Sequence, residues 1–100
     1  MCTMIAHQIQ IQGCGKGAGG WIEIRQVDVS YDHPFHYPEE HALNIDFVNE
    51  SSGPSARIAV ELDPASAQNL AYSILAVLDQ AKKGGFLAVQ PQNNDQAVER

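Results

Sequence analysis

The sequence predicts an α+β fold: a four-stranded antiparallel sheet, connected as a meander, with one C-terminal amphipathic helix packed on one face. Four segments alternate apolar and polar residues, which is typical of half-buried strands. The links between them are short, which favours antiparallel neighbours. One longer segment near the C-terminus carries apolar residues at spacings of three and four, which is typical of a helix.

The first two predicted strands surround a glycine-rich turn. Residues 5–12 alternate between isoleucine or histidine on one face and alanine or glutamine on the other. Residues 13–20 predict a hairpin loop, because the strand that follows offers no helix N-terminus for a dinucleotide phosphate. In the second strand, residues 21–31, the apolar side chains change parity at Arg25 and Gln26. This change predicts a β-bulge at those two residues.

The later elements follow from alternation and from helix boundary residues. Strands are predicted over residues 42–49 and 56–62, with a turn rich in Ser, Gly and Pro between them. Asp63 and the proline after it begin a helix, and two glycines end it after Lys83. We expect the apolar stripe of this helix to belong to the core.

Length and charge limit the class of protein. One hundred residues make one domain, predicted over residues 1–89, with a polar and disordered tail over residues 90–100. Residues 86–89 pair as an edge strand or pack under a neighbouring subunit. The net charge of −6 predicts no nucleic-acid partner, and the lack of a long apolar run predicts no membrane partner. No export signal is recognisable, so we expect a cytoplasmic protein, and the thin sheet predicts a homodimer.

Three of the four histidines, His33, His36 and His41, lie within nine residues. Two prolines between them exclude regular structure and predict a stiff loop. Imidazole binds zinc, iron, copper and nickel, and three imidazoles leave coordination positions open. The spacing is that of neither a zinc-protease helix nor a cupin strand. It predicts a centre for a divalent transition metal, with zinc or iron ahead of copper or nickel.

Further candidate residues complete this predicted site. Cys2, whose thiol lies beside the terminal amine once Met1 is removed, and His7, on the first strand, are additional candidate metal ligands. Glu40 or Asp46 would accept a proton from a metal-bound water as general base. The predicted function is that of a small metal-binding protein. The same ligand set would suit a metalloenzyme that acts on a small molecule through activated water or oxygen chemistry.

Two other interpretations stay open. In one, the chain is a non-enzymatic binding or interaction module, whose histidine loop is rigid architecture and whose ligand is a small molecule. For His7, the alternative to a metal ligand is a core-edge histidine bonded to a backbone group. In the other, a thiol-dependent enzyme pairs Cys2 with His7. Metal analysis of freshly isolated protein separates the metal centre from the binding module.

Several stretches also carry a resemblance. The chain opens Met-Cys-Thr, has a Gly-x-Gly-Lys-Gly loop, and reads Asp-His-Pro-x-His-x-Pro-x-Glu-His-x-Leu-Asn-Ile-Asp-Phe over residues 32–47. In these features it resembles a family of short, uncharacterised bacterial proteins, over residues 1–80. The resemblance implies no reaction, and Cys14 departs from the family's pattern. It implies one shared site made of Cys2, His33, His36, Glu40, His41, Asn44 and Asp46.

Overall fold

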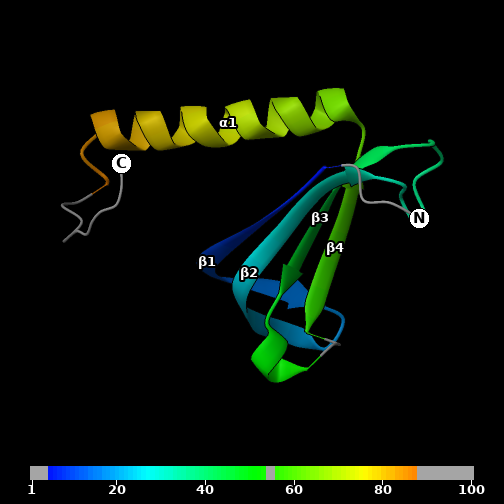
Figure 1. The fold of residues 1–100 in the computed structure, drawn as a ribbon. Coiled ribbons are helices and arrows are strands. Elements are labelled where there is room, and N and C mark those ends of the chain that lie inside the picture. Colours follow the sequence, from blue (N-terminus) through cyan, green and yellow to red (C-terminus); the bar gives the residue numbers. More distant parts are fainter. Residues whose placement is uncertain (1–4, 54–55, 88–100) are drawn as a thin grey trace. The chain divides into compact units, whose positions relative to one another are not determined.

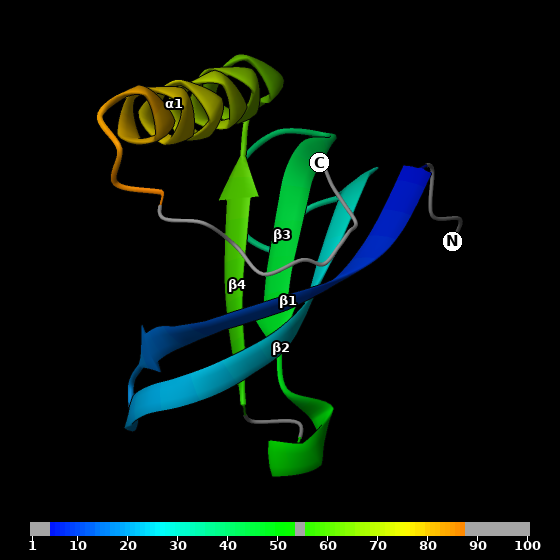
Figure 2. The same ribbon diagram turned by 90° about the vertical axis from the view of Figure 1, so that its left-hand side faces the viewer.

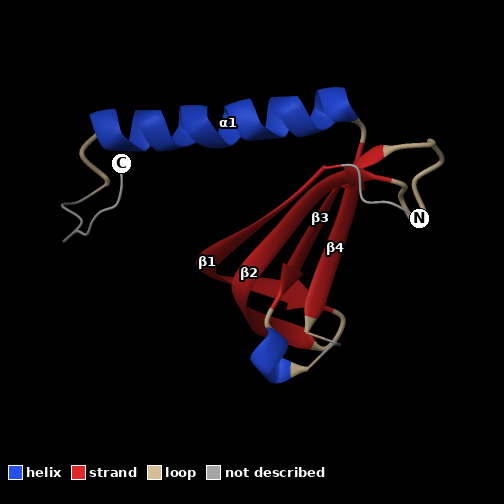
Figure 3. Cartoon of the chain, in the orientation of Figure 1, coloured by secondary structure: helices blue, strands red, loops and turns tan. Residues whose placement is uncertain are grey.

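The structure is a computed structural model that describes residues 5–53 and 56–87. The elements in chain order are β1 (Ile5–Gly17), β2 (Gly20–Asp32), β3 (Ala42–Val48), the 3-10 helix η1 (Glu50–Ser52), β4 (Arg57–Leu62) and α1 (Pro64–Lys83) (Figures 1 and 3). The four strands form one antiparallel sheet in the order β1-β2-β3-β4. The predicted α+β fold, a meander followed by one helix, is confirmed.

Two compact units make up the chain, residues 1–67 and residues 68–100. The first contains the sheet and the second contains most of α1. Cys2 and the predicted tail over residues 90–100 lie outside the described residues, as does half of the predicted apolar run at residues 86–89.

Helix α1 begins and ends as predicted. Pro64 occupies its first position, where a missing N–H costs nothing. At the other end Gly85 adopts a positive φ of 81°, and the Phe86 N–H donates to the Ala81 carbonyl at 2.8 Å. This is the glycine-dependent ending in which the chain reverses and satisfies the last carbonyls. No helix among the described residues is long and apolar enough to span a membrane.

The β1–β2 hairpin is longer than the sequence predicts. Pairing continues to Gly17 and Gly20, so the predicted loop over residues 13–20 is wrong except at its tip. Glycine hides the alternation that marks a strand, although its backbone pairs like any other. Figure 2 shows the hairpin end curling across the sheet. A Cβ on Gly15 would lie 2.6 Å from Cδ1 of both Ile24 and Ile58. Only glycine therefore fits here unless the two isoleucine side chains shift.

The bulge lies on β1. Gln10 pairs with Gln26 and Gly13 pairs with Ile24, so two residues of β1 stand opposite Arg25 alone. The prediction placed the bulge at the correct position along the β1–β2 pair, next to Arg25, but on β2 instead of β1. Ile24 and Val27 are nevertheless both buried, because the strong twist at a bulge turns residues of both parities toward the core.

The strand register gives the sheet an apolar and a polar face. Directly paired residues of antiparallel strands point to the same side. The apolar face carries the rows Val27–Phe47–Ile58, Val29–Ile45–Val60 and Tyr31–Leu43–Leu62. The polar face carries the rows Ser30–Asn44–Glu61 and Asp28–Asp46–Ala59. Polar side chains therefore gather at the end of the sheet where the β2–β3 connection begins.

Candidate functional site

The histidine loop, residues 33–41, connects β2 to β3. It starts and closes on the paired residues Asp32 and Ala42, which are 8 % and 0 % exposed. An Asp32 carboxylate oxygen accepts the His33 N–H at 2.7 Å, which turns the chain out of the strand. The loop therefore leaves and enters the sheet at a buried, hydrogen-bonded point.

Glu61, on β4, holds the middle of the histidine loop. Its carboxylate accepts the backbone N–H groups of Phe35 at 2.6 Å, His36 at 2.9 Å and Tyr37 at 2.7 Å. Charge-assisted bonds of this kind are stronger than neutral ones. The donors, with Tyr37 and then Phe35 contributing most, hold the pKa of Glu61 below its ordinary value of 4.5. We call this arrangement the Glu61 clamp.

Two of the three loop histidines come together. The ring centroids of His33 and His41 lie 4.8 Å apart, and the His41 ring stacks on Tyr31 at 5.7 Å. His33 Nδ1 lies 3.0 Å from the Glu40 carbonyl oxygen. A carbonyl only accepts, so in the neutral imidazole this contact assigns the proton to Nδ1 and the lone pair to Nε2. His33 and His41 thus form an imidazole pair with a free ligand atom on His33.

The other predicted site residues lie elsewhere. His36 enters the clamp through its backbone, and its side chain is exposed. His7 pairs with Val29 on the apolar side of the sheet, while Asp46 lies on the polar face. Within residues 5–53 and 56–87, no three His, Cys, Asp or Glu side chains form a group that could hold a metal. The metal centre stays a prediction, and its candidate ligand Cys2 lies outside those ranges.

A pocket of about 400 Å³ lies between the histidine loop and the polar face. We call it the loop pocket. Strands β2, β3 and β4 and the loop all contribute to its lining. The polar residues of the lining are Ser30, Asp32, His33, Asn44, Asp46, Arg57 and Glu61.

Most of these polar groups are already paired. Arg57 donates to Asp46 Oδ1 from Nε at 3.0 Å and from a terminal nitrogen at 2.8 Å. Both bonds use the same carboxylate oxygen, which leaves Oδ2 as an acceptor. The described lining of the pocket has three carboxylates, those of Asp32, Asp46 and Glu61, and one guanidinium, that of Arg57. The pocket is therefore negatively charged and rich in acceptors.

Asn44 is the exception to this pairing. Its Nδ2 donates to the Asp32 carbonyl at 3.4 Å, which fixes the orientation of the amide, since the reverse would oppose two oxygens. Its Oδ1 is buried and accepts no hydrogen bond from any described residue. A buried acceptor without a donor costs free energy. Asn44 also lines the loop pocket, so a ligand donor that reached this oxygen would remove that cost.

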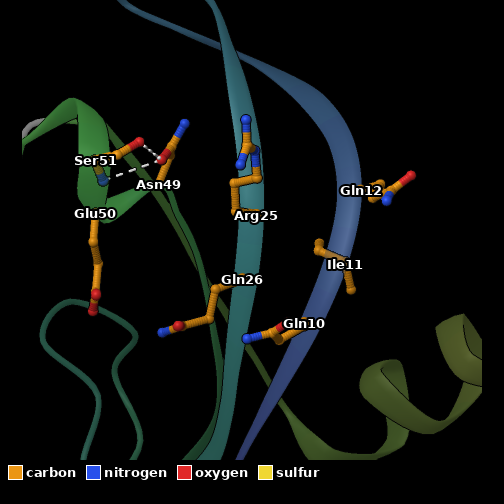
Figure 4. A pocket seen from close by; sticks show the side chains of 8 residues that line it. All are labelled: Gln10, Ile11, Gln12, Arg25, Gln26, Asn49, Glu50 and Ser51. Carbon is orange, nitrogen blue, oxygen red and sulfur yellow. Dashed lines mark hydrogen bonds between the residues drawn. The ribbon is translucent and has the colours of Figure 1, made fainter.

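A larger pocket, of about 570 Å³, lies at the opposite end of the strands, beside the bulge and η1 (Figure 4). Its buried side chain, Asn49, already accepts hydrogen bonds from the Ser51 backbone at 3.2 Å and hydroxyl at 2.7 Å. These bonds cap η1 and leave the amide oxygen occupied. This pocket is the larger of the two, but the loop pocket is the better candidate for binding, because its lining includes Asn44, whose oxygen has no donor among the described residues.

The sequence analysis assigned no site role to Glu61 and Arg57, which lie in the predicted strand over residues 56–62. The signal was present in their parity: both belong to the strand face that the register aligns with Asn44 and Asp46. The predicted meander already placed the fourth strand beside the third, but only the structure shows that Glu61 reaches the histidine loop.

The chain matches a family model described as a family of unknown function (DUF6295), over residues 1–87. No curated protein and no solved structure matches it. The match therefore spans the sheet, the histidine loop and α1, and it brings no assigned reaction.

Proposed function

We propose that this chain, which belongs to the family of unknown function named above, is a binding module. Its loop pocket would bind a small organic cation. The observation that carries the proposal is Asn44, which lines a negatively charged pocket and whose buried Oδ1 accepts no hydrogen bond from any described residue. A ligand with several N–H groups and a positive charge, such as an ammonium or guanidinium compound, would supply the missing donor.

Charge supports a cation over an anion. Asp46 keeps an oxygen that Arg57 does not use, and Asp32 uses one oxygen for the His33 N–H. A cation would gain attraction from these carboxylates, whereas the one guanidinium among the described lining residues, that of Arg57, is already paired. The whole chain, at −6, also raises the local concentration of cations.

Preorganisation supports binding as the role of the loop. The Glu61 clamp holds the loop through three backbone bonds before any ligand arrives. A loop that is already ordered loses less entropy when a ligand binds. This explains the stiff histidine loop without assigning every histidine to a metal.

Titration of the full chain, followed by ¹H–¹⁵N NMR, tests this function. Methylguanidinium is expected to shift the Asn44 side-chain amide and the Arg57 Nε–H, with a dissociation constant on the order of 1 mM for so small a probe. Butylammonium should act at the same residues, and butyrate should not. Equal shifts with butyrate, or shifts confined to residues 10–12 and 49–51, would contradict the proposal.

The imidazole pair supports a second candidate function, the binding of zinc or iron. His33 and His41 approach within 4.8 Å, and the free Nε2 of His33 suits such a metal. Further ligands would come from water, from Cys2 or from a substrate. Asp46 is held by Arg57, so Glu40, next to His41 in the chain, is the better candidate for a general base.

Elemental analysis after purification without chelators tests this candidate. Near-stoichiometric zinc or iron is expected, with strong loss in both His33→Ala and His41→Ala. His7→Ala is the matched control and should keep its metal, because His7 lies in the row of Val29, away from the loop. Metal-free wild-type protein, or equal loss in His7→Ala, would eliminate the candidate.

A further inference from the structure

Strand β1 forms one edge of the sheet and, among the described strands, pairs only with β2. An edge strand presents a row of N–H and C=O groups without partners, and proteins usually protect it with charges, prolines or short length. The other edge, β4, follows this rule: it has six residues and carries Arg57 and Glu61. β1 does not, since it has 13 residues with no Asp, Glu, Arg or Pro and with one lysine, Lys16.

We propose that a second copy of this chain pairs with the first half of β1, antiparallel and across a two-fold axis. Residues 5–10 are all exposed, and Ile5 and Ile9 are 58 % and 50 % exposed. Both isoleucines lie on the apolar side, in the rows of Tyr31 and Val27. Pairing with another strand would cover their side chains and satisfy the backbone at once.

The sequence of this segment is complementary to itself. Ile5, His7 and Ile9 alternate with Ala6, Gln8 and Gln10. When identical strands pair antiparallel around one residue, positions of equal parity stand opposite each other. Isoleucine then faces the apolar positions of the partner, and the apolar faces of the two sheets become continuous. An offset by one residue would place the two apolar faces on opposite sides.

Charge also favours a copy of the same chain at this strand. The chain carries −6 overall, which opposes association of two copies through most of their surface. Residues 5–15 carry no formal charge, so the two copies would meet where repulsion is smallest. The pairing closes after two copies, because the remaining free edges are the charged β4 strands.

Sedimentation velocity of the full chain over a range of concentrations tests the inference. The wild type is expected to be a dimer at high concentration. The double variants Ala6→Lys/Gln8→Lys and Ala6→Glu/Gln8→Glu place like charges next to the two-fold axis. Each should raise the dissociation constant of the dimer about tenfold. Mixing the two variants should restore dimers, because the charges are then opposite, and restoration also shows that both variants fold.

Ala76→Lys/Gln80→Lys is the matched control, since it adds the same charges to exposed positions of α1. It should leave the dimer unchanged. A monomeric wild type would overturn the inference, as would a dimer that the β1 variants do not weaken. Weakened single variants whose mixture stays monomeric would overturn it too.

Discussion

Glu61→Ala should release the histidine loop and abolish binding of the methylguanidinium probe. The substitution removes the acceptor for three backbone N–H groups and one of the three carboxylates of the loop pocket. Hydrogen exchange at the amides of Phe35, His36 and Tyr37 is expected to rise roughly tenfold or more, since these bonds are what protects them. Exchange measured by NMR on the full chain reads each amide separately.

Controls and pH make this result specific to the clamp. Glu39→Ala removes the same charge from the exposed loop and should leave the three amides protected. The folded-state pKa of Glu61 is lowered, so the clamp contributes fully above the ordinary value of 4.5 and is lost as the pH falls through the lower, folded value. Protection in the wild type should therefore persist at pH 5 and disappear only below 4.5. Unchanged exchange in Glu61→Ala would show that the clamp does not hold the loop.

Asn44→Leu should abolish binding of the probe and, at the same time, stabilise the protein. Binding is lost because the unpaired acceptor is gone. Stability rises because a buried acceptor without a donor costs about 1–3 kcal/mol, and leucine has a similar size without that cost. We expect a gain of about 1 kcal/mol in the free energy of unfolding, measured with urea, since the long bond to the Asp32 carbonyl is also lost.

Asn49→Leu is the matched comparison, because it changes a buried asparagine whose oxygen is satisfied. Asn49 is 4 % exposed and accepts two hydrogen bonds from Ser51. Leucine there should destabilise the protein by about 1–3 kcal/mol and leave binding of the probe unchanged. If Asn44→Leu instead destabilises as much as Asn49→Leu, the Asn44 oxygen has a partner in solution and the main support for the binding function is removed.

The histidine segment shows how far residue spacing predicts a site. The prolines predicted a stiff loop, and the absence of helix and strand between β2 and β3 is confirmed. Spacing alone predicted three converging imidazoles, and the structure brings His33 and His41 together but gives His36 a backbone role. The direction of a side chain in an irregular loop depends on the bonds that hold the loop. Here those bonds come from Glu61, more than twenty residues further along the chain.

The strands likewise have features that the local sequence predicts and features that depend on their pairing with other strands. Alternation predicted the faces of β3 and β4 correctly, because a strand's side-chain period is a local property. It failed at residues 13–17, where glycines carry no side-chain pattern, and it placed the bulge on the wrong strand. Which of two paired strands holds the extra residue depends on their register, and a single strand does not encode its register.

The sequence by itself determined the elements of this protein: four strands, a proline-stiffened loop, and a helix with its proline start and glycine end. Those features arise from backbone geometry and side-chain periods that act within a few residues. Tertiary structure alone decided that β4 supplies Glu61 to the loop, that Arg57 pairs with Asp46, and that the Asn44 oxygen is left without a donor. These outcomes depend on strand register, which sets which distant side chains share one face of the sheet.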